Sequence, residues 1–276
     1  MHKHKQMLLN PSASDGDRGI PGDIPLVAHR GYAARYPENT RESLAAAVSV
    51  GAKFLEFDIQ LSADGVPVLL HDASLERTAG RRGTVFDLSA AELTRIEVNE
   101  NDRLGGTFKG VRIPRLREVA TDLSGWPGVI AFVEIKKQSL NHFGIGFTLD
   151  RVLDALAQVL DFCVVISFSA DAVLEARHRC NCAIGWALPL WSEESHQTAI
   201  RLAPEYLFCD HLLLPPPAQA LWQGSWRWVA YEVAEADLAR SLVQRGVHMI
   251  ETMAIAEMMG LTGQEPGSTS ANAFPI

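Results

Sequence analysis

The stretch Leu26-Val-Ala-His29-Arg30-Gly31 is the main indication of the fold, because a short apolar run ends directly in ionisable residues. The same pattern returns at Phe54-Leu-Glu56-Phe-Asp58 and again at Leu69-Leu70-His71-Asp72. In a barrel of alternating strands and helices, the carboxyl ends of the strands share one face, and catalytic residues gather there. We therefore expect these ionisable residues to meet at the mouth of such a barrel.

The chain from residue 24 to residue 260 alternates strand-like and helix-like patterns, as expected for one domain. The strand candidates are Leu26–Ala28, Phe54–Ile59, Ile130–Ile135, Val164–Phe168, Ala183–Ala187, Tyr206–Cys209, Trp228–Tyr231 and His248–Glu251. The helix candidates include Thr40–Val50, Leu149–Leu160, Ala170–Arg179 and Ala236–Gly246. Eight alternations favour an α/β fold of the (β/α)8 TIM barrel type. A doubly wound open sheet is the alternative, but no glycine-rich phosphate loop follows the first strand.

Residues 58–71 depart from this alternation, because no helix fits between their two extended runs. Asp64-Gly65 predicts a tight hairpin turn, which would return His71 to the side of Asp58. Residues 73–112 are rich in polar residues and glycine, so we expect a small insertion after the second strand, over the barrel mouth. Within it, Asp87 or Ser89 should begin a short helix at residues 90–96. We further expect a mobile leader at 1–23 and a flexible tail at 261–276.

Composition limits the function and the location of the protein. The formal net charge of −8 disfavours a nucleic-acid binder, which normally presents a basic face. No apolar stretch has the length of a membrane span, and the run after the basic N-terminus is too short for a signal peptide. The four cysteines fit no common zinc pattern: Cys163, Cys180, Cys182 and Cys209. Buried free thiols and a reducing, cytoplasmic location are therefore expected.

The carboxylates suggest a metal site. Glu56 and Asp58 lie two residues apart in an apolar strand, so both side chains point to the same face. Two buried acids repel each other, and a hard divalent cation such as Mg²⁺ or Ca²⁺ would relieve the repulsion. Glu134 ends another strand in the same way, and Glu38 follows the first strand; we expect these as third and fourth ligands. The alternative is that the acids only form salt bridges at the rim.

Two histidines and two cations complete the predicted site. His29 ends the first strand and His71 ends the hairpin, where they could act as a general acid and a general base. Arg30 follows His29, and Lys136 shares its strand face with Glu134, so both could contact an anionic group such as phosphate. Together with the acids, these residues predict metal-assisted hydrolysis of a phosphodiester.

The ordered set of motifs resembles the glycerophosphodiester phosphodiesterase family, from about residue 25 to residue 255. The motifs are His29-Arg30-Gly31, Pro37-Glu38-Asn39-Thr40, Glu56-Phe-Asp58, Asp64-Gly65, His71-Asp72, Leu75–Gly80, Ile113–Glu118, Glu134-Ile135-Lys136 and Ser167-Phe168. The resemblance implies a barrel with an inserted lid, one Mg²⁺ or Ca²⁺ ion, and hydrolysis of a small-molecule glycerophosphodiester to glycerol 3-phosphate and an alcohol. Matched by position, Glu38, Glu56, Asp58 and Glu134 correspond to metal ligands. His29 and His71 correspond to the acid–base pair, and Arg30 and Lys136 to phosphate contacts.

The resemblance weakens in the last two strands. The family usually has a Trp-x-Val-Asn motif where this chain has Trp228-Val-Ala-Tyr231-Glu232, and an Ile-Thr-Asp ending where it has Ile250-Glu251-Thr252-Met253. Trp228 is still expected to line the glycerol pocket. Two alternatives stay open: a lysophospholipase D or sphingomyelinase D-like enzyme with an apolar surface near Leu212–Trp222, and a non-catalytic metabolite-binding barrel.

Overall fold

A closed barrel of eight parallel strands forms the centre of the protein. The computed structural model describes residues 24–98 and 100–260, so the expected leader and tail lie outside the described residues. The barrel strands are β1 (Leu26–Ala28), β2 (Phe54–Leu61), β4 (Ile130–Ile135), β5 (Cys163–Ser167), β6 (Ala183–Ala187), β7 (Tyr206–Asp210), β8 (Arg227–Tyr231) and β9 (Met249–Thr252). β1 pairs with both β9 and β2, which closes the sheet and excludes the doubly wound alternative. The predicted (β/α)8 barrel is confirmed.

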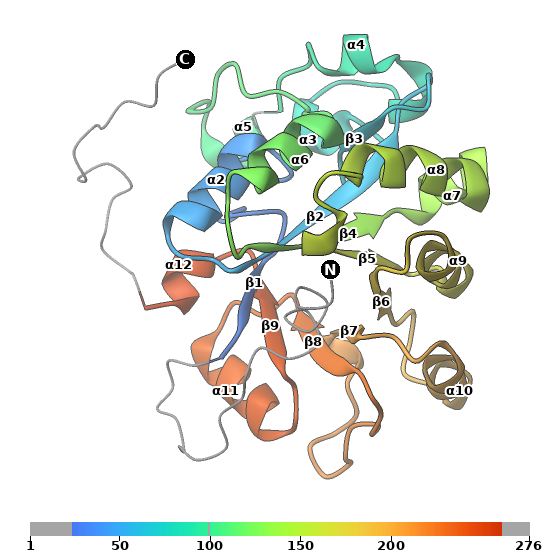
Figure 1. Ribbon diagram of the computed structural model, residues 1–276. Helices are drawn as coiled ribbons and strands as arrows, with labels where there is room; N and C mark the ends of the chain where they lie inside the picture. The colour runs from blue at the N-terminus through green and yellow to red at the C-terminus, as the bar shows by residue number, and fades with distance from the viewer. Residues whose placement is uncertain (1–23, 99, 261–276) are drawn as a thin grey trace.

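Helices surround the strands on the outside (Figure 1). They are α2 (Arg41–Ser49), α6 (Leu116–Ser124), α7 (Lys137–Phe143), α8 (Ile145–Leu156), α9 (Ala170–Cys180), α10 (Glu193–Leu202), α11 (Ala236–Gln244) and α12 (Ile255–Met258). Short 3₁₀ turns precede β5 and follow β7, at Leu160–Phe162 and His211–Leu213. α2 begins as the sequence indicated, since the Thr40 hydroxyl accepts a hydrogen bond from the Ser43 amide at 3.1 Å.

Alternate residues of each strand face the inside of the barrel, and this parity decides which side chains can reach the mouth. Phe132, Tyr206, Phe208 and Val229 belong to the inner cluster, where aromatic rings fill the barrel below the site. Their strand neighbours point outward against the helices. Because parallel strands are buried on both faces, they read as continuous apolar runs and hide this parity in the sequence.

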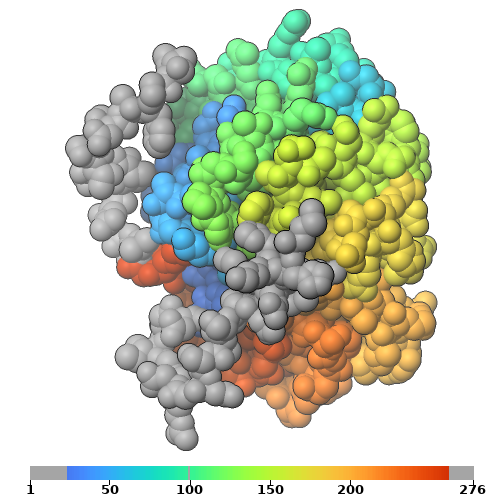
Figure 2. Space-filling model, in the orientation of Figure 1, coloured from blue at the N-terminus to red at the C-terminus, as the bar shows by residue number. Residues whose placement is uncertain are grey.

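The predicted hairpin is present above the barrel. β3 (Pro67–Leu69) pairs antiparallel with β2, and the Leu70 amide donates to the Asp58 carbonyl at 3.1 Å. The expected insertion follows and contains α3 (Glu76–Ala79), the 3₁₀ turn Val85–Asp87, α4 (Ala90–Leu93) and α5 (Asn101–Leu104). It has its own apolar cluster and forms the top of the molecule in Figure 2, where its described residues are coloured cyan to green.

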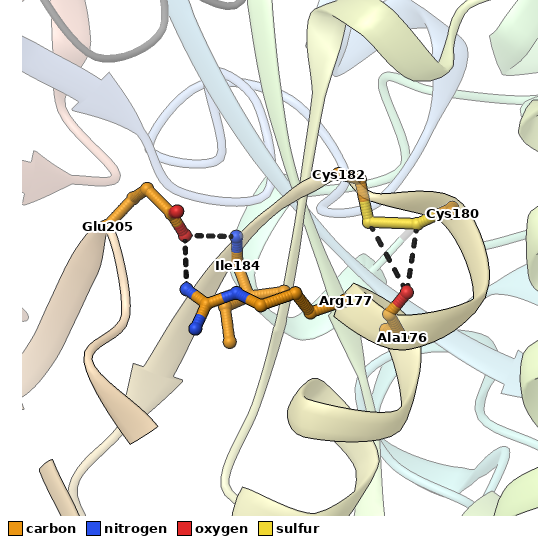
Figure 3. Close-up of a disulfide and its surroundings, with 6 residues drawn as sticks. All are labelled: Ala176, Arg177, Cys180, Cys182, Ile184 and Glu205. Carbon is orange, nitrogen blue, oxygen red and sulfur yellow. Dashed lines mark hydrogen bonds and ion pairs between the residues drawn. A yellow bond between two sulfur atoms is a disulfide. The ribbon is translucent and has the colours of Figure 1, made fainter. Parts of the chain in front are cut away.

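The cysteines differ from expectation at one point. Cys163 and Cys209 are free and buried, as predicted, whereas Cys180 and Cys182 form a disulfide at the turn from α9 to β6 (Figure 3). The expectation of a free thiol is therefore wrong for these two residues. The C-terminal end of α9 brings the two residues together, because Asn181 between them adopts a left-handed conformation. The bond lies at the amino end of β6, opposite the barrel mouth.

Candidate active site

Three acids from two adjacent strands form the deepest part of the candidate site. Glu56 and Asp58 point inward from β2, and the register of β2 with β4 sets Asp58 opposite Glu134. Carboxylate oxygens of these three residues lie within 4.8 Å of one another. Glu56 is 1% exposed, and its Oε1 has no hydrogen-bond partner among the described residues. A buried, unpartnered carboxylate oxygen within an all-oxygen donor set fits a hard divalent cation.

Arg30 and Lys136 supply the positive charge of the site. Lys136 Nζ lies 3.1 Å from Asp58 Oδ1 and 2.7 Å from Glu134 Oε1, while Arg30 Nε lies 3.2 Å from Asp58 Oδ2. Asn39 holds Asp58 from the other side through two hydrogen bonds, of 2.8 and 2.9 Å. The structure therefore brings both predicted phosphate contacts to the acid group.

Glu38 lies beside this group but contacts arginines. Its Oε1 accepts from Arg30 Nη1 at 3.0 Å and from Arg77 Nη2 at 2.7 Å, and its Oε2 accepts from Arg77 Nη1 at 2.8 Å. Glu38 is not part of the clustered acids that could hold a metal among the described residues. Its assignment as a fourth ligand stays a prediction, and the contacts favour a role in holding the two arginines.

His29 is enclosed by carboxylates. Its Nε2 lies 3.5 Å from Glu251 Oε1 and 3.8 Å from Glu56 Oε2, and its Nδ1 lies 3.9 Å from Glu232 Oε1. The backbone amide of Arg30 donates to Glu56 Oε2 at 3.0 Å, which fixes the loop that carries the histidine. Burial, reinforced by the charge of Arg30, lowers the pKa of His29 well below its usual value, so the imidazole is neutral at pH 7.

His71 is oriented by a chain of charged groups that begins in the insertion. Its Nδ1 lies 2.6 Å from Asp72 Oδ1, and Asp72 Oδ2 accepts from Arg77 Nε at 2.6 Å. A carboxylate at Nδ1 favours a proton on that nitrogen and leaves Nε2 available for proton transfer. Asp72 thus has the relation to His71 that orients a catalytic base.

Burial and the neighbouring charges divide the acids into two kinds. Burial alone would raise the pKa of Asp58, but Lys136 and Arg30 outweigh it and hold that pKa well below its usual range. Burial raises the pKa of Glu134 to about 7, against the opposing charge of Lys136. Burial and the charges of Asp58 and Glu251 raise the pKa of Glu56 as well. The protein alone therefore leaves part of this acid group without a compensating charge.

Glu251 is the acid that sequence reasoning did not assign to the site. It points inward from β9, is 3% exposed, and forms a second possible ligand group with His29 and Glu56. Burial, with Glu134 and Asp58 nearby, raises its pKa well above the usual value. The signal was present in the sequence, because Glu251 is an acid inside an apolar strand, as are Glu56 and Glu134.

The expectation for Trp228 is corrected by the structure. Trp228 points outward from β8, where it packs with Trp191 and donates through Nε1 to the Trp222 carbonyl at 3.1 Å. Strand parity is the reason, since Val229 and Tyr231 are the residues of β8 that face inward. Tyr231 is therefore the aromatic residue that this strand contributes to the site.

A cavity of about 130 Å³ lies at the carboxyl ends of the strands, next to the acid cluster. His29, Arg30, His71, Glu134 and Lys136 form its polar wall. Ile166, Phe168, Ala187, Phe208 and Tyr231 form an apolar wall, with Glu232 and Glu251 between the two walls. Such a cavity could hold an anion against Arg30 and Lys136, with two histidines in the same space for proton transfer.

Comparison with known proteins gives a consistent result. Residues 29–165 match the model of the glycerophosphoryl diester phosphodiesterase family. Glycerophosphodiester phosphodiesterase 1 of Bos taurus is 35% identical over 154 residues, which is 56% of this chain and 45% of that protein. A glycerophosphodiester phosphodiesterase of Caldanaerobacter subterraneus is 35% identical over 120 residues, 44% of this chain and 48% of that protein. The chain thus spans about half the length of these relatives.

Solved structures show the same fold. An Oleispira antarctica phosphodiesterase in complex with the product sn-glycerol-3-phosphate superposes with a TM-score of 0.74 at 23% identity, covering 86% of this chain and 96% of that one. A glycerophosphodiester phosphodiesterase of Thermotoga maritima superposes with a TM-score of 0.65 at 21% identity, covering 86% and 98%.

Proposed function

This chain belongs to the glycerophosphoryl diester phosphodiesterase family, and from that premise we propose that it hydrolyses glycerophosphodiesters to glycerol 3-phosphate and an alcohol. One observation carries the proposal: a single cavity is lined by both cations, both histidines and Glu134, and Glu134 is clustered with Glu56 and Asp58. The relatives named for this activity and the neighbour bound to sn-glycerol-3-phosphate support it. A binding barrel without catalysis would have no need for a buried histidine and a half-buried histidine beside an acid group.

We assign Glu56, Asp58 and Glu134 as the residues that hold one divalent cation, Mg²⁺ or Ca²⁺. When bound, the cation would neutralise charge on the phosphodiester and on the transition state. Arg30 and Lys136 approach the same acids and would bind the phosphate oxygens at the cavity wall. The oxygen-only donor set supports a hard cation over zinc or iron.

His29 and His71 would transfer the protons. One histidine accepts the proton of the nucleophile, either water or the glycerol 2-hydroxyl, and the other donates a proton to the leaving alkoxide. Asp72 keeps Nε2 of His71 available for this step. Carboxylates on both sides of the His29 ring restrict its orientation. Both histidines lie at the cavity in this arrangement, which is the first requirement for acid–base catalysis.

The test measures glycerol 3-phosphate released from glycerophosphocholine by the purified chain, with Mg²⁺ or Ca²⁺ titrated after EDTA treatment. His29→Ala and His71→Ala should each lower kcat/KM at least about 100-fold with the fold retained. His178→Ala is the matched control, because His178 is exposed on α9, away from the mouth. Near-normal turnover by either active-site variant would refute the assignment of that histidine.

A lysophospholipase D-like activity is the second candidate, on one observation. Leu212 is 78% exposed in the segment that follows β7 at the barrel mouth, where an acyl chain could lie. A higher kcat/KM for lysophosphatidylcholine than for glycerophosphocholine would favour this activity. No helix within the described residues is long and apolar enough to cross a membrane.

A cytoplasmic location is also proposed. It rests on the buried free thiols of Cys163 and Cys209. The Cys180–Cys182 disulfide counts against it, since such bonds persist mainly in oxidising compartments. Labelling the thiols of freshly isolated protein would show whether Cys180 and Cys182 are reduced, as expected in the cytoplasm, or oxidised.

A further inference from the structure

The two basic side chains of the cavity lie on a different arc of the barrel from Glu232 and Glu251, and the acid Glu134 is paired with Lys136. The arc formed by β1 and β4 carries the cations Arg30 and Lys136. The arc from β5 to β9 contributes apolar side chains together with Glu232 and Glu251, and no basic side chain from that arc lines the cavity within the described residues. A zwitterionic ligand would match this arrangement, with its phosphate at Arg30 and Lys136 and its positive group at the arc that carries Glu232.

Glu232 is the acid of the β5–β9 arc that a ligand can reach from solvent. It directly follows β8 with a φ of 60°, so the chain turns sharply and the Val233 amide donates to the Glu251 carbonyl at 3.3 Å. The Glu232 side chain is 48% exposed, whereas that of Glu251 is 4% exposed. Glu232 Oε1 also lies 3.9 Å from His29 Nδ1, which places the carboxylate next to the reacting centre.

Two aromatic residues of the same arc line the cavity together with this carboxylate. Tyr231 comes from the inward face of β8 and Phe168 follows β5, and both line the cavity. Ala187, at the end of β6 between them, is small and leaves space at the wall. The faces of aromatic rings attract ammonium and quaternary ammonium groups, and a nearby carboxylate adds to the attraction.

We propose that Phe168, Tyr231 and Glu232 bind a cationic head group, such as that of choline or ethanolamine, in a glycerophosphodiester whose phosphate lies at Arg30 and Lys136. The inference rests on the proposed function and assigns the substrate class of the same site. A neutral head group such as glycerol gains nothing from the carboxylate, and an anionic head group is repelled by it. The chain therefore prefers zwitterionic diesters.

The kinetic test compares kcat/KM for glycerophosphocholine with kcat/KM for glycerophosphoglycerol, in the native enzyme with its cation. We expect the ratio of the two to exceed one and to fall about three- to tenfold in Glu232→Gln, as the loss of a partly exposed charge pair predicts. The ratio cancels any effect of the variant on His29, because both substrates share the reaction. Glu235→Gln is the control: it removes the same charge three residues later, on an exposed residue outside the cavity, and should leave the ratio unchanged.

A binding experiment separates this proposal from the proposed function. Calorimetric titration of His71→Ala with both diesters, with and without Glu232→Gln, measures head-group preference when turnover is abolished. If no diester is hydrolysed by the native chain, the proposed function fails, and the same titration of the native chain still tests the head-group site. Tighter binding of glycerophosphocholine that is lost with Glu232 supports the proposal. Equal binding of both diesters, a preference that survives Glu232→Gln, or no binding of either would overturn it.

Discussion

The acids at the barrel mouth should make the stability of the protein depend on pH and on metal, and Glu134→Gln measures the effect. Burial raises the pKa of Glu134 from its ordinary 4.5 to about 7. An acid with a raised pKa in the folded state stabilises the protein below its unfolded pKa, and this contribution is lost as the pH rises through 7. The shift corresponds to about 3 kcal/mol. Above pH 7, metal-free Glu134→Gln should therefore unfold at a higher temperature than the native chain.

Thermal unfolding followed by circular dichroism in EDTA provides the assay, at pH 5 and at pH 8. About 3 kcal/mol corresponds to roughly 6–12 °C in Tm for a chain of this size. The difference between native and variant should be small at pH 5 and near this value at pH 8. Comparing the two proteins cancels the opposing effect of His29 and His71, whose lowered pKa values stabilise the folded state as the pH rises through 6.5.

A saturating divalent cation should reverse the order of the two proteins. At 1,000 times its Kd a bound ion stabilises the folded state by about 4.1 kcal/mol, which exceeds the deficit of about 3 kcal/mol in the native chain, and the neutral amide introduced by Glu134→Gln would be a weaker ligand than the carboxylate. Glu194→Gln, on an exposed residue of α10, is the control and should change neither curve. If Glu134→Gln is no more stable than the native chain at pH 8 in EDTA, Glu134 carries no uncompensated charge and the reasoning is wrong.

Three further predictions follow from single contacts. Asp72→Asn should lower kcat about 10- to 100-fold with little change in KM, because His71 loses the carboxylate that sets its tautomer; steady-state kinetics measure this. Glu251→Gln should raise the Tm of the metal-free protein at pH 8, since it removes a buried acid whose pKa is raised. Gly185→Ala should destabilise the barrel by about 1–3 kcal/mol in denaturant titration, because its Cβ would lie 2.6 Å from Ile166 and 2.9 Å from Phe208.

The fold was accessible from sequence because its signals are local. Strand positions followed from apolar runs, and the Asp64-Gly65 turn predicted the hairpin that brings His71 to the mouth. The acids of β2 and β4 were predicted in the same way, since a charge in a buried strand must be paired with an opposite charge or with a metal ion. These inferences required only that the parallel strands end on one face.

The errors came from information that no single segment contains. Trp228 was assigned to the pocket because of its position in a motif, but both faces of β8 are apolar and only the closed barrel decides that Tyr231 faces inward. The Cys180–Cys182 bond depends on the left-handed turn at Asn181, which residue spacing alone did not indicate. Glu251, like Glu56, is an acid within an apolar strand. Its contact with His29 joins the last strand of the barrel to the first, so no single segment of the sequence indicates it.

The insertion contributes to the site through charge, and this limits how it can act. Arg77, from α3, binds both oxygens of Glu38 and one oxygen of Asp72. The Glu38 amide in turn donates to Glu100 Oε2 at 2.9 Å, and Arg103 donates to the carbonyls of Ala33 and Tyr36, so the segment that follows β1 is bound to the insertion at several points. Withdrawing the insertion would leave Glu38, which is 6% exposed, without Arg77 and would release Asp72 from its partner. Opening would therefore disturb His71 at the same time, since Asp72 orients its ring. An insertion linked in this way would act as a fixed part of the proposed active site, and a substrate would then enter on the side of the cavity lined by Phe168, Tyr231 and Glu232.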